Sequence, residues 1–148
     1  MADSLIIKTS KLSEVYDLAP RLREDDIKEI EATGQTVEAS LLNGFKTSTE
    51  CLSVFEATTG NIVGMFGYTL INHIAGIWFL GTDEMEKYPF AFIRKGKQFI
   101  NKLIDKGYTL VCCAYSKNST HLKYIKSLGL VEQAKYTFND NEFITYIK

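Results

Sequence analysis

Residues 77–107, IWFLGTDEMEKYPFAFIRKGKQFINKLIDKG, decide the fold. The apolar run at their start predicts a strand that ends at a Gly-Thr break, and Pro89 predicts the start of a long helix that Gly107 ends. A helix start has unpaired backbone N–H groups and a partial positive charge. A strand, a short loop and a helix start near cations often bind a phosphate-bearing ligand in α/β proteins. We therefore expect such a ligand near this segment.

Length, composition and charge narrow the class of protein. The chain has 148 residues, 45% of them apolar, and a net charge of −1. These values predict one globular domain over residues 1–148 and no nucleic-acid partner.

No apolar run approaches the roughly 20 residues that span a bilayer. The N-terminal MADSLIIKTSK lacks the basic start and apolar block of a signal peptide. Three cysteines make no disulfide framework. We expect a cytoplasmic protein without a membrane partner and, because no CxxC or HExxH motif occurs, without a metal site.

The hydrophobic period changes along the chain and predicts the order of elements. A strand near Leu5 precedes helical segments that begin near Ser13, Pro20 and Thr36, the last two ending at Gly34 and Gly44. Strands follow at residues 51–57, 62–70 and 75–80, then a helix at 89–106, a strand at 108–115, a helix from Asn118 or Ser119 to Gly129, and a hairpin of 134–138 with 143–147. The order βααβββαβαββ predicts an α/β (α+β) domain with a mixed sheet that begins as an antiparallel meander.

This order, with a helix after the last strand of the meander, resembles the fold of the Gcn5-related N-acetyltransferase (GNAT) superfamily. Residues 118–130, NSTHLKYIKSLGL, are similar to that superfamily's late asparagine, helix and terminal Gly-Phe signature. Together with LREDDIKEI at 22–30 and WFLGT at 78–82, they resemble a branch found in short-tailed bacteriophages, variously labelled acetyltransferase-like or internal virion protein. The resemblance covers most of the chain. It implies a splayed parallel strand pair in mid-sheet that admits acetyl-coenzyme A.

The sequence departs from the superfamily pattern in two places. The pyrophosphate loop usually carries an arginine or glutamine and two spaced glycines at the helix start, but no glycine pair lies near Phe90. Gly96 lies inside the predicted helix, where it indicates close helix packing at a cost of about 1 kcal/mol relative to alanine. The superfamily's general-acid tyrosine often lies four residues before the terminal glycine. That position is Ile125, and Tyr124 should point about 100° away from it.

The resemblance also implies coenzyme contacts, each with an alternative. Arg94 and Lys95 could reach the diphosphate, or form a solvated cationic face. Asn118 could contact the coenzyme arm, or cap its own helix. The backbone of Phe79, Leu80, Gly81 and Thr82 could pair with the pantetheine amides, or be an ordinary strand end.

The acidic helix carries the candidate catalytic residues. Asp26 has Leu22 and Ile30 four residues away on either side, where an amphipathic helix normally has an apolar residue. Such a carboxylate suits a general base or an amine binder, and Glu29, three residues on, can face the same space. Alternatively, Asp26 pairs with a buried arginine or lysine, or caps a helix broken at Pro20.

We expect the other conspicuous side chains to have structural roles. Cys112 and Cys113 should face opposite sides of a buried strand, and no partnered histidine is evident for either. His121, in the first turn of its helix, reads as a surface or capping residue.

Two functions follow from these features. The first is transfer of an acetyl group from acetyl-coenzyme A to an amine on a small molecule or a protein, in the cytoplasm of an infected host cell. The second is a non-catalytic phage protein of the same fold that serves in the virion or binds a host protein. The inward Asp26 favours the first function, while Ile125 and the missing glycines favour the second. Either function is compatible with a homodimer.

Overall fold

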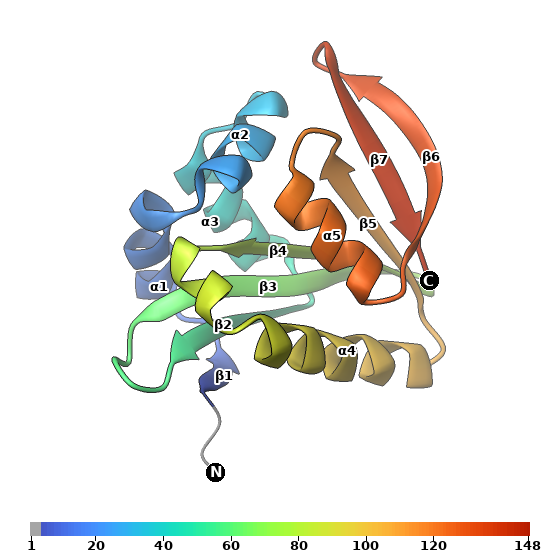
Figure 1. Ribbon diagram of the computed structural model, residues 1–148. Coiled ribbons are helices and arrows are strands. Elements are labelled where there is room, and N and C mark those ends of the chain that lie inside the picture. Colours follow the sequence, from blue (N-terminus) through green and yellow to red (C-terminus); the bar gives the residue numbers. More distant parts are fainter. Residues whose placement is uncertain (1–3) are drawn as a thin grey trace.

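The computed structural model describes residues 4–148, so the first three residues of the N-terminal MADSLIIKTSK lie outside it. A seven-stranded mixed sheet has the order β1-β2-β3-β4-β5-β7-β6. Helices α1 to α3 cover one face, and α4 and α5 cover the other (Figure 1). The elements are β1 Leu5–Thr9, α1 Leu12–Leu18, η1 Ala19–Arg21, α2 Glu24–Ala32, α3 Val37–Thr47, β2 Glu50–Glu56, β3 Ile62–Ile71, β4 Ile74–Gly81, η2 Asp83–Lys87, α4 Pro89–Asp105, β5 Thr109–Tyr115, α5 Ser119–Ser127, β6 Val131–Phe138 and β7 Asn141–Ile147. No helix within residues 4–148 is long and apolar enough to cross a membrane.

The predicted antiparallel meander is confirmed. Strands β1 to β4 pair antiparallel in sequence order. The turns between them use residues that tolerate a left-handed backbone: Gly60 has φ +74° and Asn72 has φ +56°. The C-terminal hairpin turns in the same way through Asn139 and Asp140, with φ +52° and +61°, so β7 begins at Asn141.

The three helical segments predicted near Ser13, Pro20 and Thr36 are present before β2, although the order βααβββαβαββ counts only two helices there. Three α-helices and the 3₁₀ turn η1 occupy this region. Lys11, rather than Ser13, precedes the first helix. Pro20 lies in η1, and the extended Leu22 separates that turn from α2.

The third helix begins at the predicted Thr36 cap, whose side chain accepts a hydrogen bond from the Ala39 N–H. It continues past Gly44, where the sequence predicted its end. A Cβ atom on Gly44 would lie 2.9 Å from Cζ2 of Trp78, so this glycine serves close packing and does not end the helix.

The predicted splayed strand pair is also confirmed. Parallel β4 and β5 pair only from Ile74–Thr109 to Gly76–Val111. Beyond these pairs, β5 continues beside β7 on its other edge, and β4 continues beside β3. The inner edges of β4 and β5 therefore separate toward their C-terminal ends, and the space between them is available to other parts of the chain or to a ligand.

Helices α4 and α5 pack closely over this splay at Gly96. A Cβ atom there would lie 2.3 Å from the Tyr124 hydroxyl oxygen and 2.8 Å from Cδ2 of Leu128. The Tyr124 ring is held by its hydrogen bond to the Phe92 carbonyl oxygen, at 3.1 Å, and by the Phe79 ring. The sequence-based reading of Gly96 as a helix-packing position agrees with this geometry.

We predict that Gly96→Val destabilises the protein by about 2 kcal/mol, because the added methyl groups must displace Tyr124 or Leu128. A thermal scan should show a melting temperature lower by roughly 5 °C. Gln98→Val introduces the same side chain at an exposed position of the same helix and should change the melting temperature little. Equal losses in the two variants would show that the contact between α4 and α5 is not the cause.

Candidate active site

Two carboxylates of α2 bridge the separated ends of β4 and β5. Asp26 Oδ2 accepts a hydrogen bond from the Gly81 N–H at 3.0 Å, and Glu29 Oε2 accepts one from the Tyr115 N–H at 3.1 Å. Gly81 ends β4 and Tyr115 ends β5. The structure thus brings the two predicted catalytic residues together at the open end of the splay.

Asp26 is held by more than one partner. Its side chain is deeply buried, and the Arg23 guanidinium donates to Oδ2 from Nη2 at 2.9 Å and from Nε at 3.2 Å. Asn118 Nδ2 donates to its other oxygen, Oδ1, at 3.0 Å. This is the pairing with a buried arginine that the sequence left open. A catalytic role for Asp26 stays a prediction, and its contacts suit a residue that positions Arg23 and Asn118.

Asn118 connects α5 to both carboxylates. Its Oδ1 accepts from the His121 N–H at 3.1 Å, which caps α5 as the sequence allowed. Its Nδ2 also donates to Glu29 Oε2, at 3.1 Å. The side chain is 1% exposed, so its amide faces the carboxylates, and its contact with a coenzyme arm stays a prediction.

His121 belongs to this candidate site, and the sequence did not indicate that. It is 5% exposed rather than on the surface, and its Nδ1 lies 3.0 Å from the Glu29 carboxylate. Burial alone would lower the pKa of His121, but the charge of Glu29 and hydrogen bonding to Cys112 and Glu29 raise it well above its ordinary value. The Glu29 carboxylate therefore favours the protonated form of His121.

Two clefts on opposite faces of the sheet share lining residues beside Asp26 and Glu29. The α3 cleft, of about 350 Å³, lies among α2, α3 and the end of β4. The α4–α5 cleft, of about 340 Å³, lies between the first turns of α4 and the length of α5. Phe79 and His121 line both clefts. These two side chains therefore stand where a group in one cleft would meet a group in the other.

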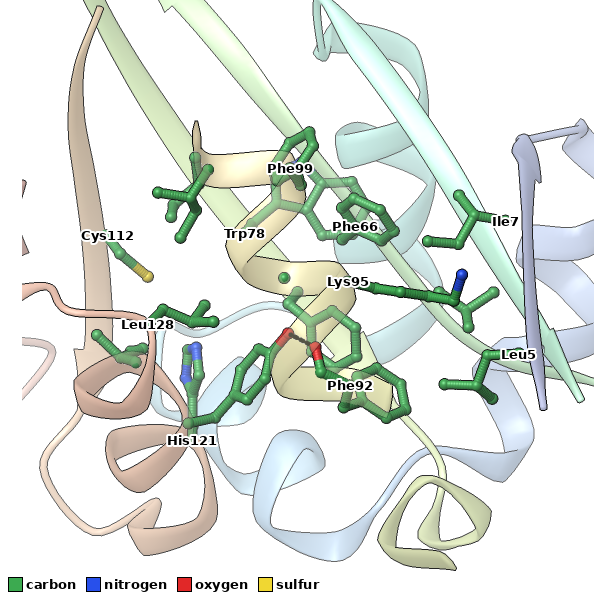
Figure 2. Close-up of a pocket in the computed structure, with 17 residues that line it drawn as sticks. Leu5, Ile7, Phe66, Trp78, Phe92, Lys95, Phe99, Cys112, His121 and Leu128 are labelled. Atoms are coloured by element: carbon green, nitrogen blue, oxygen red, sulfur yellow. Dashed lines mark hydrogen bonds between the residues drawn. The ribbon is translucent and has the colours of Figure 1, made fainter. Parts of the chain in front are cut away.

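A third, narrow cavity of about 50 Å³ extends beneath α4 and is mostly apolar (Figure 2). Cys112 and His121 line one end of it. In Figure 2 the Lys95 side chain points toward Leu5 and Ile7, away from His121. Cys112 is buried and Cys113 is exposed, so the two side chains face opposite sides of β5 as predicted, but the side of Cys113 is not covered.

The cations of the α4–α5 cleft differ from those that the sequence singled out. Arg23 and Lys123 line this cleft. Arg94 is exposed on α4, and Lys95 lines the narrow cavity instead. Contact of Arg94 and Lys95 with a diphosphate stays a prediction. Arg23 was missed because its role depends on Asp26, although a basic residue three positions before an inward carboxylate is a usable signal.

Tyr124 faces the α4–α5 cleft, whereas Ile125 is buried in the core. In the sequence, counting four residues back from Gly129 placed the general-acid position at Ile125. Helical geometry then predicted that Tyr124 points away from that position. Desolvation raises the pKa of the Tyr124 hydroxyl, so this group stays neutral and keeps its hydrogen bond to the Phe92 carbonyl oxygen.

Most backbone N–H and carbonyl groups at the end of β4 already have hydrogen-bond partners. The Gly81 carbonyl oxygen accepts from the Arg23 N–H at 2.9 Å, and the Thr82 N–H donates to the Val63 carbonyl oxygen at 2.9 Å. Because the Gly81 N–H faces the splay, Phe79, two residues earlier, presents its backbone groups on the same edge. Of the predicted pantetheine contacts in residues 79–82, Phe79 has the best placement. Leu80 is buried on the side of the helices α1 to α3.

No group of three or more histidine, cysteine, aspartate or glutamate side chains within residues 4–148 is arranged to hold a metal ion.

We predict that Asp26→Asn lowers the free energy of unfolding by about 3 kcal/mol, because it leaves the Arg23 guanidinium buried without a countercharge. Urea denaturation measures this loss. Glu24→Gln, which removes an exposed ion pair with Lys28, should cost under about 1 kcal/mol. An Asp26→Asn variant as stable as the Glu24→Gln control would contradict the importance of the buried pair.

The raised pKa of His121 predicts a specific pH dependence of stability. A histidine whose folded-state pKa exceeds its unfolded value of about 6.5 contributes its full stability below that pH, and the contribution is lost as pH rises through the folded-state value. Urea unfolding between about pH 6 and about pH 9 should show this loss. His121→Gln should remove that part of the slope, and a slope unchanged in this variant would assign it to other groups.

Comparison with known proteins comes from structure alone, since no protein-family model and no curated protein sequence matches the chain. A GNAT-family acetyltransferase from Bacillus anthracis superposes with a TM-score of 0.74 at 10% identity, over 100% of this chain and 96% of that one. The ribosomal-protein-S5-alanine acetyltransferase from Vibrio fischeri gives 0.72 at 15% identity, over 100% and 94%. Spermidine N-acetyltransferase from Vibrio cholerae, in complex with CoA and spermine, gives 0.64 at 12% identity, over 98% and 95%. The chain therefore has the GNAT fold.

Proposed function

We propose that this protein transfers an acetyl group from acetyl-coenzyme A to an amine. The observation that carries the proposal is that two clefts on opposite faces of the sheet share the lining residues Phe79 and His121, where β4 and β5 separate. A two-substrate transfer needs its reactants to approach from different sides and to meet at a group that can move a proton. The GNAT fold supports the same reaction class by analogy.

The α4–α5 cleft suits the coenzyme. Arg23 donates to Asp26 from Nε and Nη2, which leaves Nη1 for an anionic group, and Lys123 adds a second cation. Arg94, exposed farther along α4, adds positive charge for the diphosphate, whereas Lys95 points into the narrow cavity (Figure 2). The backbone edge at Phe79 can pair with the pantetheine amides. When bound, the coenzyme supplies an acetyl group activated as a thioester.

The α3 cleft suits the amine acceptor. Glu29 lines this cleft, and its side chain is 14% exposed, so its carboxylate can attract the ammonium group. His121 can accept the amine proton on the ring nitrogen that Glu29 does not contact. The Tyr124 hydroxyl can return a proton to the departing thiolate on the other side. In this arrangement Asp26 positions Arg23 and Asn118 and touches neither reactant.

Isothermal titration with acetyl-coenzyme A tests binding, and release of free coenzyme thiol in the presence of an amine tests turnover. We expect saturable binding and amine-dependent release. An absence of heat and of thermal stabilisation at millimolar coenzyme would sink the proposal.

We predict that His121→Gln lowers kcat by about 10²- to 10⁴-fold, the usual contribution of a proton-transfer group. The chain's other histidine, His73, lies exposed in the turn between β3 and β4, so His73→Gln is the matched control and should keep full activity. Since His121 must be neutral to accept a proton, the activity of the unmodified protein should rise as pH passes through the raised pKa of His121, which lies above its ordinary value of about 6.5. A flat pH profile, or equal activity in both variants, would exclude His121 as the base.

A second candidate function is a non-catalytic protein of this fold. The observation that favours it is the occupation of the Gly81 and Tyr115 N–H groups by the protein's own carboxylates, which closes the open end of the splay. The sequence resemblance supports a short-tailed phage as the source, with the protein either in the cytoplasm of the infected cell or in the virion. Its partner would then be a host protein or a second copy of the chain. Detection in purified virions, together with no coenzyme binding, would favour this function.

A further inference from the structure

The side chains of the α3 cleft have an unusual charge pattern. Glu29 is the one carboxylate that lines the cleft, and no lysine or arginine of residues 4–148 lines it. The Glu29 charge is already balanced in part by His121. The cleft can therefore hold one ammonium group, but it offers no second carboxylate to another cation and no cation to an acidic acceptor.

Neutral hydrogen-bonding groups form a stripe along the cleft. Ser40, Asn43, Gly44 and Thr47 of α3 follow the i, i+3, i+4, i+7 spacing that places them on one face of the helix, and all four line the cleft. The charged residues Glu38 and Lys46 of the same helix do not line it.

The side chains of Ser40 and Asn43 have no hydrogen-bond partner among the described residues, so their hydroxyl and amide groups are available to a ligand. Exposed helix faces normally carry charges, whereas this one presents uncharged donors and acceptors to the cleft.

Trp78 forms an apolar wall beside this stripe. Its indole packs against Gly44, where a side chain would collide with it, and its Nε1 donates to Ser48 Oγ at 2.8 Å. The ring is therefore fixed in orientation and half-buried, and Trp78 lines the α3 cleft as well as the narrow cavity. A fixed aromatic surface next to hydroxyl and amide groups suits a ring with apolar C–H faces and a hydroxylated rim.

We propose that the acceptor is a hydroxylated cyclic monoamine, that is, an amino sugar. Its ammonium group binds Glu29, its hydroxyl groups bind Ser40 and Asn43, and one face of its ring packs on Trp78. The volume of about 350 Å³ lies within the range of small-molecule sites. A polyamine would leave its other ammonium groups without a carboxylate.

The acetyl-transfer step rests on the proposed function. The bound ammonium group first gives one proton to the neutral imidazole of His121 and becomes a free amine. The amine nitrogen then forms a bond to the acetyl carbon, the carbon–sulfur bond of the thioester breaks, and the coenzyme leaves as the thiol with the second proton that the nitrogen releases.

Binding can be tested without catalysis, because Trp78 is the only tryptophan in the chain. The full chain is titrated with glucosamine, with cyclohexylamine, which has a ring and an amine but no hydroxyl groups, and with spermidine, while Trp78 fluorescence is followed. Tryptophan amide titrated in parallel corrects for collisional quenching. We expect a saturable change with glucosamine at a concentration at least about tenfold below that needed for the other two amines.

Variants of α3 assign the preference to the polar stripe. Asn43→Ala and Ser40→Ala should each reduce the preference for glucosamine over cyclohexylamine by several-fold. Glu38→Gln, a substitution of the same helix outside the cleft, should leave it unchanged. No saturable change with glucosamine, or tighter binding of spermidine or cyclohexylamine, would overturn the inference.

The assay for acetyl transfer separates the two proposals. Saturable glucosamine binding without transfer supports the amino-sugar site while the acetyltransferase proposal fails. Transfer to other amines, with glucosamine neither bound nor acetylated, overturns the amino-sugar site and keeps the acetyltransferase.

Discussion

The fold depends on hydrogen-bond acceptors for the backbone N–H groups that lose their partners where the sheet splits. Where β4 and β5 separate, the inner edge of each strand loses its partner, and every buried N–H group left without an acceptor costs about 1–3 kcal/mol. Asp26 and Glu29 supply acceptors for the Gly81 and Tyr115 N–H groups, and Asn118 Nδ2 links the two carboxylates. The α2 helix thus does for the open end of the splay what a neighbouring strand does elsewhere.

Buried carboxylates must be paired with positive charges. This requirement determines where the cationic side chains of the candidate site lie. Arg23 neutralises Asp26 and also lines the α4–α5 cleft, and His121 neutralises Glu29 and also lines both clefts. The groups that make the split sheet stable are consequently those that a ligand in either cleft would meet. A structural and a catalytic role need not compete here, because each charged pair has one member facing a cleft.

Local patterns in the sequence predicted much of the fold. These patterns act within a few residues: the strand pattern, the Thr36 cap and Pro89 at the start of α4. The splayed strand pair was predicted from the family resemblance. The partners of the site were beyond such patterns. Glu29 and His121 are 92 residues apart, and a helical period shows which face a residue occupies but not which residue of another element it meets. Gly44 was misread for a related reason, since a glycine that admits Trp78 looks the same in sequence as a helix stop.

The Glu29–His121 pair sets a condition on the proposed chemistry. The carboxylate that fixes the imidazole also keeps it protonated, and a protonated imidazole cannot accept a proton from an amine. An acceptor enters the α3 cleft as an ammonium ion, and the charge it would seek is the same Glu29 carboxylate. Its arrival therefore places a second cation beside His121 and weakens the attraction that raises the pKa of this histidine. In this way the charge of the substrate would itself help to release the proton from His121, so that the base becomes competent when the acceptor is in place.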